Sequence, residues 1–249
     1  MFVEDVTADL SAPQPLNLGE TALFLDLDGT LAPIAERPQD VGPDPRRTDL
    51  LERLGERLEG RLAVISGRTL ADVDRILEGR VAPVAAVHGL VLRDPQGAVH
   101  STAAHPGLAG ATAELRRFAA RHPGLLVEEK GLSVALHFRQ AGGEAQACKT
   151  IARDLAYRTG LAVQDGDMVE ELRTPGPSKG DSVRSFMQQA PFAGARPVFV
   201  GDDATDEDGF EMAQALGGMG VAVGARRLRH AGFRLPDVEA ALAWLEAGL

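Results

Sequence analysis

The segment Thr21-Ala-Leu-Phe-Leu-Asp26-Leu-Asp28-Gly29-Thr30 decides the fold that this sequence predicts. Its apolar half is typical of a strand that is buried on both faces of a parallel sheet. Two acids and a glycine follow this strand directly. Ligands of open α/β sheets bind beyond the carboxyl ends of the strands, so both carboxylates stand where chemistry is expected. The alternative interpretation of the same residues is an Asp-Gly turn that closes a hairpin.

Buried-strand patterns recur along the chain, with helical patterns between them. Further strands are predicted at residues 61–65, 84–87, 197–200 and 221–223, and helices at residues 50–58, 69–78, 181–189 and 207–216. Strands and helices in this alternating order are typical of a doubly wound parallel sheet. The predicted fold class is therefore α/β.

The pattern changes between about residues 102 and 173. Helices are predicted there at residues 109–121 and 144–157, and strands at residues 132–138, 161–163 and 168–172, the first with one exposed face. Such a group indicates a small α+β unit with an antiparallel sheet. We expect residues 21–101 and 174–249 to form the core, residues 102–173 an inserted domain, and residues 1–20 a loose lead-in.

Composition limits the classes of function. The 249 residues include 26 Lys and Arg against 36 Asp and Glu, which gives a formal net charge of −10. General binders of nucleic acid or anionic membranes need a basic surface, so neither partner is expected. The single cysteine, Cys148, excludes an internal disulfide. Acids near the start argue against a secretory signal, and no apolar run approaches the roughly 18–20 residues of a membrane span. We expect a cytoplasmic protein.

A second acidic cluster, Gly201-Asp202-Asp203-Ala-Thr-Asp206-Glu207-Asp208, also follows a predicted buried strand. Carboxylates this dense repel one another unless a cation compensates, which favours a hard divalent ion such as Mg²⁺. The alternative is an acidic helix start, stabilised by the helix dipole. That alternative accounts for Glu207 and Asp208, but Asp202 and Asp203 precede the predicted helix.

Two further segments offer groups that suit a phosphate. In Ser66-Gly67-Arg68, a hydroxyl and backbone N–H groups at a helix start can bind a phosphate oxygen. The ammonium group of Lys179, at the start of another predicted helix, can neutralise a phosphoryl group. Taken singly, a helix cap and a solvated lysine are the better explanations of these residues.

In this order, the four motifs resemble those of the haloacid dehalogenase (HAD) superfamily of phosphotransferases. Large α/β caps of that superfamily are inserted between the second and third motifs, where residues 102–173 lie. Longer strings resemble the trehalose-6-phosphate phosphatase family: Asp26 to Ile34, Ser66-Gly67-Arg68, His88-Gly89, Glu129 to Arg139, Glu171-Leu-Arg and Gly201 to Asp208. The resemblance spans about residues 21–210. Ser178 departs from it, because the family more often has asparagine before the Lys-Gly pair.

The resemblance implies a Rossmann-like core with an α+β cap. It also implies Mg²⁺-dependent hydrolysis of trehalose 6-phosphate through an aspartyl-phosphate, the last step of trehalose biosynthesis. Asp26 would be the nucleophile. Asp28 would protonate the leaving oxygen and then accept a proton from water. Ser66 and Lys179 would hold the transferring oxygens.

The resemblance implies a magnesium site at the same place. Mg²⁺ would be bound by Asp26, by the backbone carbonyl of Asp28 and by Asp202, with water completing the octahedron. Asp203 and Asp206 would support the metal or its water ligands.

The resemblance further assigns sugar recognition to polar residues of the cap and of the facing core. The candidates are Lys130, His137, Arg139 and Glu171 in the cap, and Arg68, His88 and Gly89 in the core. A solvated sheet face and, for His88, a packing role are the alternatives. The expected partner is a small sugar phosphate, with functional coupling to a trehalose-6-phosphate synthase.

Two other functions are compatible with this scaffold: a phosphatase for another sugar phosphate, and a non-catalytic domain that binds a sugar phosphate. The second is disfavoured, because binding alone does not require both a nucleophile (Asp26) and an acid (Asp28).

Overall fold

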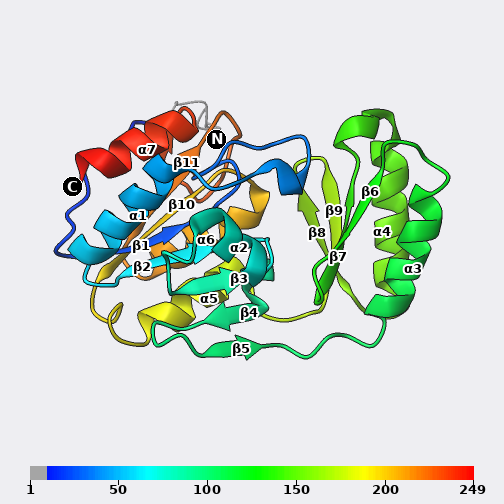
Figure 1. Cartoon of the computed structure of the whole chain (residues 1–249), viewed down its shortest axis with the longest axis horizontal. Coiled ribbons are helices and arrows are strands. Elements are labelled where there is room, and N and C mark those ends of the chain that lie inside the picture. The colour runs from blue at the N-terminus through cyan, green and yellow to red at the C-terminus, as the bar shows by residue number, and fades with distance from the viewer. Residues whose placement is uncertain (1–9) are drawn as a thin grey trace, which may run out of the picture.

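A large sheet and a smaller one organise the chain (Figure 1) in the computed structural model, which describes residues 10–249. The large sheet has the strand order β12-β11-β10-β1-β2-β3-β4-β5. Its strands are β1 (Thr21–Leu25), β2 (Leu62–Ile65), β3 (Val84–Ala86), β4 (Val91–Arg93), β5 (Val99–Ser101), β10 (Arg196–Gly201), β11 (Met219–Val223) and β12 (Phe233–Leu235). The first six in the spatial order are parallel, and β4 and β5 extend the sheet in antiparallel fashion. This confirms the predicted α/β fold class.

Helices cover both faces of the large sheet. They are α1 (Pro45–Arg57), α2 (Leu70–Leu77), α5 (Lys179–Met187), α6 (Glu207–Ala215) and α7 (Val238–Ala247). Alternate residues of each strand point to opposite faces. Leu23 and Leu25 of β1 pack in one apolar cluster with α1, α2 and α7, whereas Phe24 packs in a second cluster with α5 and α6. The sheet is therefore doubly wound.

The strand order places the ends of β1 and β10 at a topological switch point. From β1 the chain proceeds to β2 and β3 on one side, and it later returns to β10, β11 and β12 on the other. In the parallel register of β1 and β10, Leu25 pairs with Val200. The segments that follow, Asp26 and Gly201-Asp202, leave the same edge of the sheet. Ligands of doubly wound folds bind at such a point.

The smaller sheet is formed by residues between β5 and α5. Its order is β6 (Leu126–Glu129), β7 (Ser133–His137), β9 (Val169–Arg173) and β8 (Ala162–Gly166), and every neighbouring pair is antiparallel. The helices α3 (Leu108–Ala119) and α4 (Ala145–Thr159) cover the face that points away from the large sheet (Figure 1). Cys148 of α4 is fully buried in the apolar cluster between these layers.

The structure corrects one expectation about this sheet and adds elements that the sequence did not predict. Residues 133–136 of β7 are all buried, so the expected exposed face is wrong. One face packs on α3 and α4, and the other faces the large sheet (Figure 1). The elements missing from the prediction are β4, β5, β6, β12 and α7. Three of these strands have only three residues, too few for a periodic pattern.

The described part of the lead-in is packed rather than loose. Residues 10–18 form no helix or strand, yet Leu16 and Leu18 are buried in the core. The indole nitrogen of Trp244 in α7 donates a hydrogen bond to the carbonyl of Gln14 at 2.9 Å. Residues 1–9 of the predicted lead-in lie outside the described residues. In the range 10–249, no helix has the length and hydropathy that a membrane crossing requires.

Candidate active site

A buried lysine joins the two acidic motifs at the switch point. Lys179, the first residue of α5, is 3% exposed. Its Nζ donates to Asp26 Oδ1 at 2.8 Å and to Asp206 Oδ1 at 2.6 Å. Ser178 caps the helix by accepting a hydrogen bond from the backbone N–H of Asp181, which fixes where the lysine emerges. A buried cation thus neutralises part of the charge of two buried carboxylates.

The second acidic motif forms its own capping structure. Asp206 Oδ2 accepts the backbone N–H groups of Asp202 at 3.0 Å and Asp203 at 3.1 Å. Asp203 Oδ1 in turn accepts the backbone N–H and the hydroxyl of Thr205 at 2.8 and 2.6 Å. Asp206 is therefore a fully buried brace, and Asp203 caps a short 3₁₀ turn (Ala204–Asp206). This arrangement leaves the Asp202 side chain free of hydrogen bonds to any of residues 10–249.

The arrangement of acids fits a divalent cation. One carboxylate oxygen each from Asp26, Asp202 and Asp206 lie within 4.8 Å of one another. Gly29, with φ of +80°, passes so close that a Cβ built on it would lie 2.1 Å from Asp202 Oδ2. The backbone at Gly29 therefore leaves room only for this carboxylate. Carboxylate oxygens are the ligands that Mg²⁺ prefers.

The electrostatics of these acids point the same way. Burial raises the pKa of Asp26 well above its ordinary value, although Lys179 lowers it in part. Burial, together with Asp206 and Asp203, raises the pKa of Asp202 to about 8. Burial lowers the pKa of Lys179, but Asp206 and Asp26 outweigh it and raise that pKa well above its ordinary value. The positive charge of Lys179 thus compensates only part of the negative charge of these carboxylates, and a bound metal ion would compensate the remainder.

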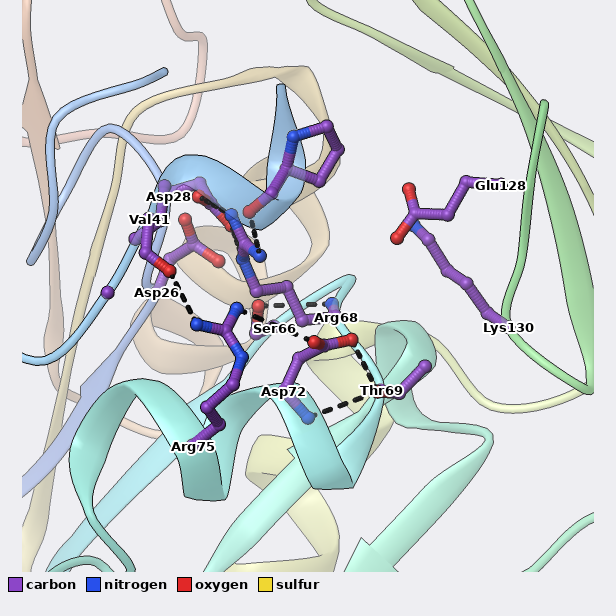
Figure 2. A network of polar contacts seen from close by, with 12 residues as sticks. Asp26, Asp28, Val41, Ser66, Arg68, Thr69, Asp72, Arg75, Glu128 and Lys130 are labelled. Carbon is purple, nitrogen blue, oxygen red and sulfur yellow. Dashed lines mark hydrogen bonds and ion pairs between the residues drawn. The ribbon is translucent and has the colours of Figure 1, made fainter. Parts of the chain in front are cut away.

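The remaining groups of the large sheet lie beside this cluster. Asp28 is held by Arg68, whose Nε and Nη2 donate to its two oxygens at 2.6 and 2.7 Å (Figure 2). Ser66, at the end of β2, is 1% exposed, and its Oγ accepts the backbone N–H of Arg68 at 3.2 Å. His88 has left-handed φ and ψ of 56° and 27°, and a Cβ on Gly67 would lie 2.5 Å from its Nε2.

The smaller sheet presents paired polar residues toward the large one. Lys130 Nζ donates to Glu171 Oε2 at 2.7 Å, and His88 Nε2 lies 3.6 Å from the same oxygen. Burial raises the pKa of Glu171, but Lys130 and His88 outweigh it and lower it far below its ordinary value. Arg139 donates to Asp167 Oδ2 at 2.8 Å.

A cavity of about 170 Å³ separates the two sheets, and residues of both line it. Twelve of the predicted site residues line it: Asp26, Asp28, Ser66, Arg68, His88, Lys130, His137, Arg139, Glu171, Lys179, Asp202 and Asp203. Asp206 lies behind the wall, completely buried. Gly89 is not in the lining. Its φ is +102°, and a Cβ there would lie 2.7 Å from the carbonyl oxygen of Ser178, so its visible role is close packing against the start of α5.

Comparisons with known proteins agree on one family. The family model described as trehalose-phosphatase matches residues 24–232. The "Trehalose-6-phosphate phosphatase" of Escherichia coli (strain K12) is 39% identical over 227 residues, covering 90% of this chain and 85% of that protein. The chain belongs to the trehalose-phosphatase family. Relatives named in this way are phosphoric monoester hydrolases, and the chain is an enzyme of that class.

Solved structures place this trehalose-phosphatase family member within the HAD fold. A "trehalose-6-phosphate phosphatase related protein" has a TM-score of 0.75 and 26% identity, covering 90% of this chain and 95% of that one. A phosphatase of the HAD enzyme superfamily from Bacteroides thetaiotaomicron has a TM-score of 0.58 and 16% identity, covering 90% and 92%. The latter likeness shows the fold alone.

The cavity of this trehalose-phosphatase family member also has lining residues that the sequence analysis missed. They include Glu128 and Gln164, which like Glu171 belong to strands of the smaller sheet, and the loop 34–38. Glu128 Oε2 and His137 Nε2 are hydrogen-bonded at 2.8 Å. Side chains two residues apart in a strand point to the same face, so a predicted strand at β6 would have placed Glu128 on the same side as Lys130. The proline-rich loop carries no periodic signal.

Proposed function

We propose that this chain hydrolyses trehalose 6-phosphate to trehalose and phosphate, the last step of trehalose biosynthesis, with Mg²⁺ bound at the acidic cluster. The observation that carries the proposal is the contact of Lys179 with both Asp26 and Asp206, at a cavity whose opposite wall carries Lys130 and Glu171. One wall suits a phosphoryl group, and the other suits sugar hydroxyls. Membership of the trehalose-phosphatase family supports that pairing.

Asp26 is the proposed nucleophile. Its carboxylate oxygen attacks phosphorus, the bond from phosphorus to the sugar oxygen breaks, and an aspartyl-phosphate forms. Lys179 holds one oxygen of Asp26, which orients the other. Asp26, Asp202 and the backbone carbonyl of Asp28 are the proposed metal ligands, with Asp203 and Asp206 in support. When bound, Mg²⁺ offsets the repulsion of the acids and polarises the phosphoryl oxygens.

Asp28 is the proposed general acid and base. It gives a proton to the sugar oxygen as that oxygen leaves. It then takes a proton from the water that attacks the aspartyl-phosphate, so that phosphate departs and Asp26 is regenerated. Ser66 and Lys179 hold the phosphoryl oxygens through both steps, because phosphoryl transfer depends on positioning and charge neutralisation.

Sugar specificity is proposed for the smaller sheet. Residues 102–173 would act as a cap over a core of residues 21–101 and 174–249. Lys130, Glu171, His137 and Arg139 would bind hydroxyl groups of the disaccharide, and closure of the cap would exclude water. The pairs Lys130–Glu171 and His137–Glu128 keep these groups hydrogen-bonded when no sugar is present. A cytoplasmic location and coupling to a trehalose-6-phosphate synthase also remain proposals.

Phosphate release from a panel of sugar phosphates, each with Mg²⁺ and with a chelator, tests the function. We expect release from trehalose 6-phosphate to exceed release from glucose 6-phosphate and sucrose 6-phosphate, and to stop with the chelator. A preference for another sugar would contradict the substrate alone. Release that continues in chelator would contradict the metal. No release from any ester would leave the non-catalytic binding domain as the better account.

A further inference from the structure

Arg68 is a buried arginine whose side-chain nitrogens already have partners within the protein. It is 7% exposed, and it follows Ser66 and Gly67 at the end of β2. Nε donates to Asp28 Oδ2 at 2.6 Å and Nη2 donates to Asp28 Oδ1 at 2.7 Å. Two parallel bonds from a guanidinium to a carboxylate fix the plane of the carboxylate as well as its position.

The third side-chain nitrogen of Arg68, Nη1, connects the Arg68–Asp28 pair to the loop that lines the cavity. Arg68 Nη1 donates to the carbonyl oxygen of Pro38 at 2.8 Å, and Arg75 Nη1 donates to the carbonyl oxygen of Val41 at 2.9 Å (Figure 2). Asp72 lies 3.6 Å from Arg75 Nη2 and accepts a hydrogen bond from the hydroxyl of Thr69, the N-cap of α2, at 2.6 Å. The pair of bonds from Arg68 to Asp28, called the fork below, is therefore fixed at two places. One is the start of α2, and the other is the loop that contains Pro38 and Val41.

We propose that Arg68 is a positioning residue for Asp28, whereas the family resemblance implied that it binds the sugar. The inference rests on the proposed function, because it presumes that Asp28 is the acid and base. The two bonds to Asp28 use one N–H of Nε and one of Nη2, and Pro38 uses one of Nη1, so only the two remaining N–H groups of Arg68 could reach a sugar hydroxyl. While the fork holds, Asp28 meets the leaving oxygen and the attacking water in one fixed orientation.

The geometry predicts which kinetic parameter depends on Arg68. A carboxylate that is displaced by about 1 Å can cost about 100-fold in rate. Loss of the fork should thus lower kcat for trehalose 6-phosphate by roughly 10- to 100-fold and leave KM within about threefold. Lysine is a point charge without the fork, so Arg68→Lys should not restore the rate.

The test compares Arg68→Gln, Arg68→Lys, Asp28→Asn and the double variant Arg68→Gln/Asp28→Asn. The matched control is Arg93→Gln. Arg93 also makes two bonds to one carboxylate, from Nη1 and Nη2 to Asp74 at 2.8 and 2.8 Å, and its Nε donates to a backbone carbonyl, but it lies outside the cavity lining. Thermal unfolding of each variant verifies that it folds, and Arg68→Lys serves where Arg68→Gln does not.

The double-mutant cycle decides the question. If Arg68 acts through Asp28, the double variant is about as slow as Asp28→Asn alone, and Arg93→Gln keeps the wild-type kcat. Four results would each overturn the proposal. The kcat losses of the two single variants could multiply in the double variant, or KM could rise at unchanged kcat. Arg68→Lys could restore the full rate, or Arg93→Gln could lose as much kcat as Arg68→Gln. A wild-type enzyme that releases no phosphate from trehalose 6-phosphate would instead contradict the proposed function.

Discussion

Gly29 is a single residue on which the geometry of the acidic cluster depends. Its φ of +80° is a conformation that residues with a Cβ adopt only at a cost of about 1 kcal/mol or more. A methyl group there would also lie 2.1 Å from Asp202 Oδ2. The glycine therefore serves both the turn after β1 and the placement of a carboxylate from a distant strand.

Gly29→Ala should displace Asp202 and weaken Mg²⁺ binding by roughly tenfold or more, as measured by calorimetry. Gly97→Ala is the control, because Gly97 has a similar φ of +85° and no atom within 4 Å of the added carbon. Both variants should lose stability from backbone strain, but only Gly29→Ala should lose metal affinity. Equal Mg²⁺ affinity in the two variants would refute the proposed site.

Glu170 is a second residue with an unusual environment, on the helix-covered face of the smaller sheet. It is 1% exposed, and among residues 10–249 neither carboxylate oxygen has a hydrogen-bond partner. Burial, followed by Asp165 on the neighbouring strand, raises the pKa of Glu170 from 4.5 to about 7, although Lys149 and Arg153 lower it in part. Folding thus favours the protonated form.

The raised pKa makes stability depend on pH. Between pH 4.5 and 7 the folded chain holds a proton that the unfolded chain has lost, so this residue's contribution falls as pH rises and stays low above 7. Glu170→Gln should therefore be more stable than wild type at pH 8, by on the order of 1–2 kcal/mol after allowance for solvent screening near Lys149. The difference should vanish toward pH 4.5.

Urea unfolding at pH 5 and pH 8 measures this difference. The exposed Glu56→Gln is the control and should show no pH-dependent difference from wild type. A Glu170→Gln variant that is no more stable than wild type at pH 8 would argue against a buried carboxyl group that folding keeps protonated.

Individual site residues differ in how well the sequence predicts them. Asp26 and Asp202 follow buried strands of a parallel sheet, so topology alone brings them to one edge. The pairing of Asp28 with Arg68 was not predictable, because it joins residues 40 apart through a loop without periodicity. Gly89 was assigned to the sugar site by resemblance, whereas its packing against α5 depends on a tertiary contact that no local pattern encodes.

Among the elements, α6 couples the second acidic motif to the loop between β11 and β12, residues 224–232. Glu207, its first residue, accepts the backbone N–H groups of Arg229 at 2.6 Å and His230 at 3.0 Å. The same loop carries Arg226, whose Nη2 lies 3.6 Å from Asp167 in the turn between β8 and β9. The helix start thus holds a loop that contacts the smaller sheet.

Glu207→Gln should release this loop, because an amide replaces one of the two acceptor oxygens with a donor. We expect a loss of about 1–2 kcal/mol in unfolding free energy and faster amide hydrogen exchange at Arg229 and His230. The exposed Glu211→Gln, in the same helix, should change neither quantity. Unchanged exchange at both amides in Glu207→Gln would mean that Glu207 does not anchor the loop.

The elements that escaped prediction share a physical cause. β4, β5 and β12 are three residues long, and their strand character comes from pairing with neighbours rather than from their own sequence. α7 contains four alanines, so the hydrophobicity of its buried face differs little from that of its exposed face. Long apolar strands such as β1 and β10 were predictable because burial on both faces leaves a continuous apolar run.

At the scale of the whole molecule, two sheets with opposite chemical demands enclose one cavity. The large sheet contributes acids, a buried lysine and a hydroxyl, and the smaller one contributes paired polar groups. The net charge of −10 disfavours polyanionic partners in general, yet Lys179 and a bound cation would make this one place favourable for a phosphoryl group. The proposed function thus places catalysis at the large sheet and sugar specificity at the smaller one.

The most direct test of this account is rapid-quench mass spectrometry of the enzyme mixed with trehalose 6-phosphate and Mg²⁺. We predict a transient mass increment of one phosphoryl group on the peptide that contains Asp26. The increment should be absent in Asp26→Asn, which should fold normally and release no phosphate. Sustained phosphate release by Asp26→Asn, or wild-type turnover with the phosphoryl group on another residue, would contradict the account.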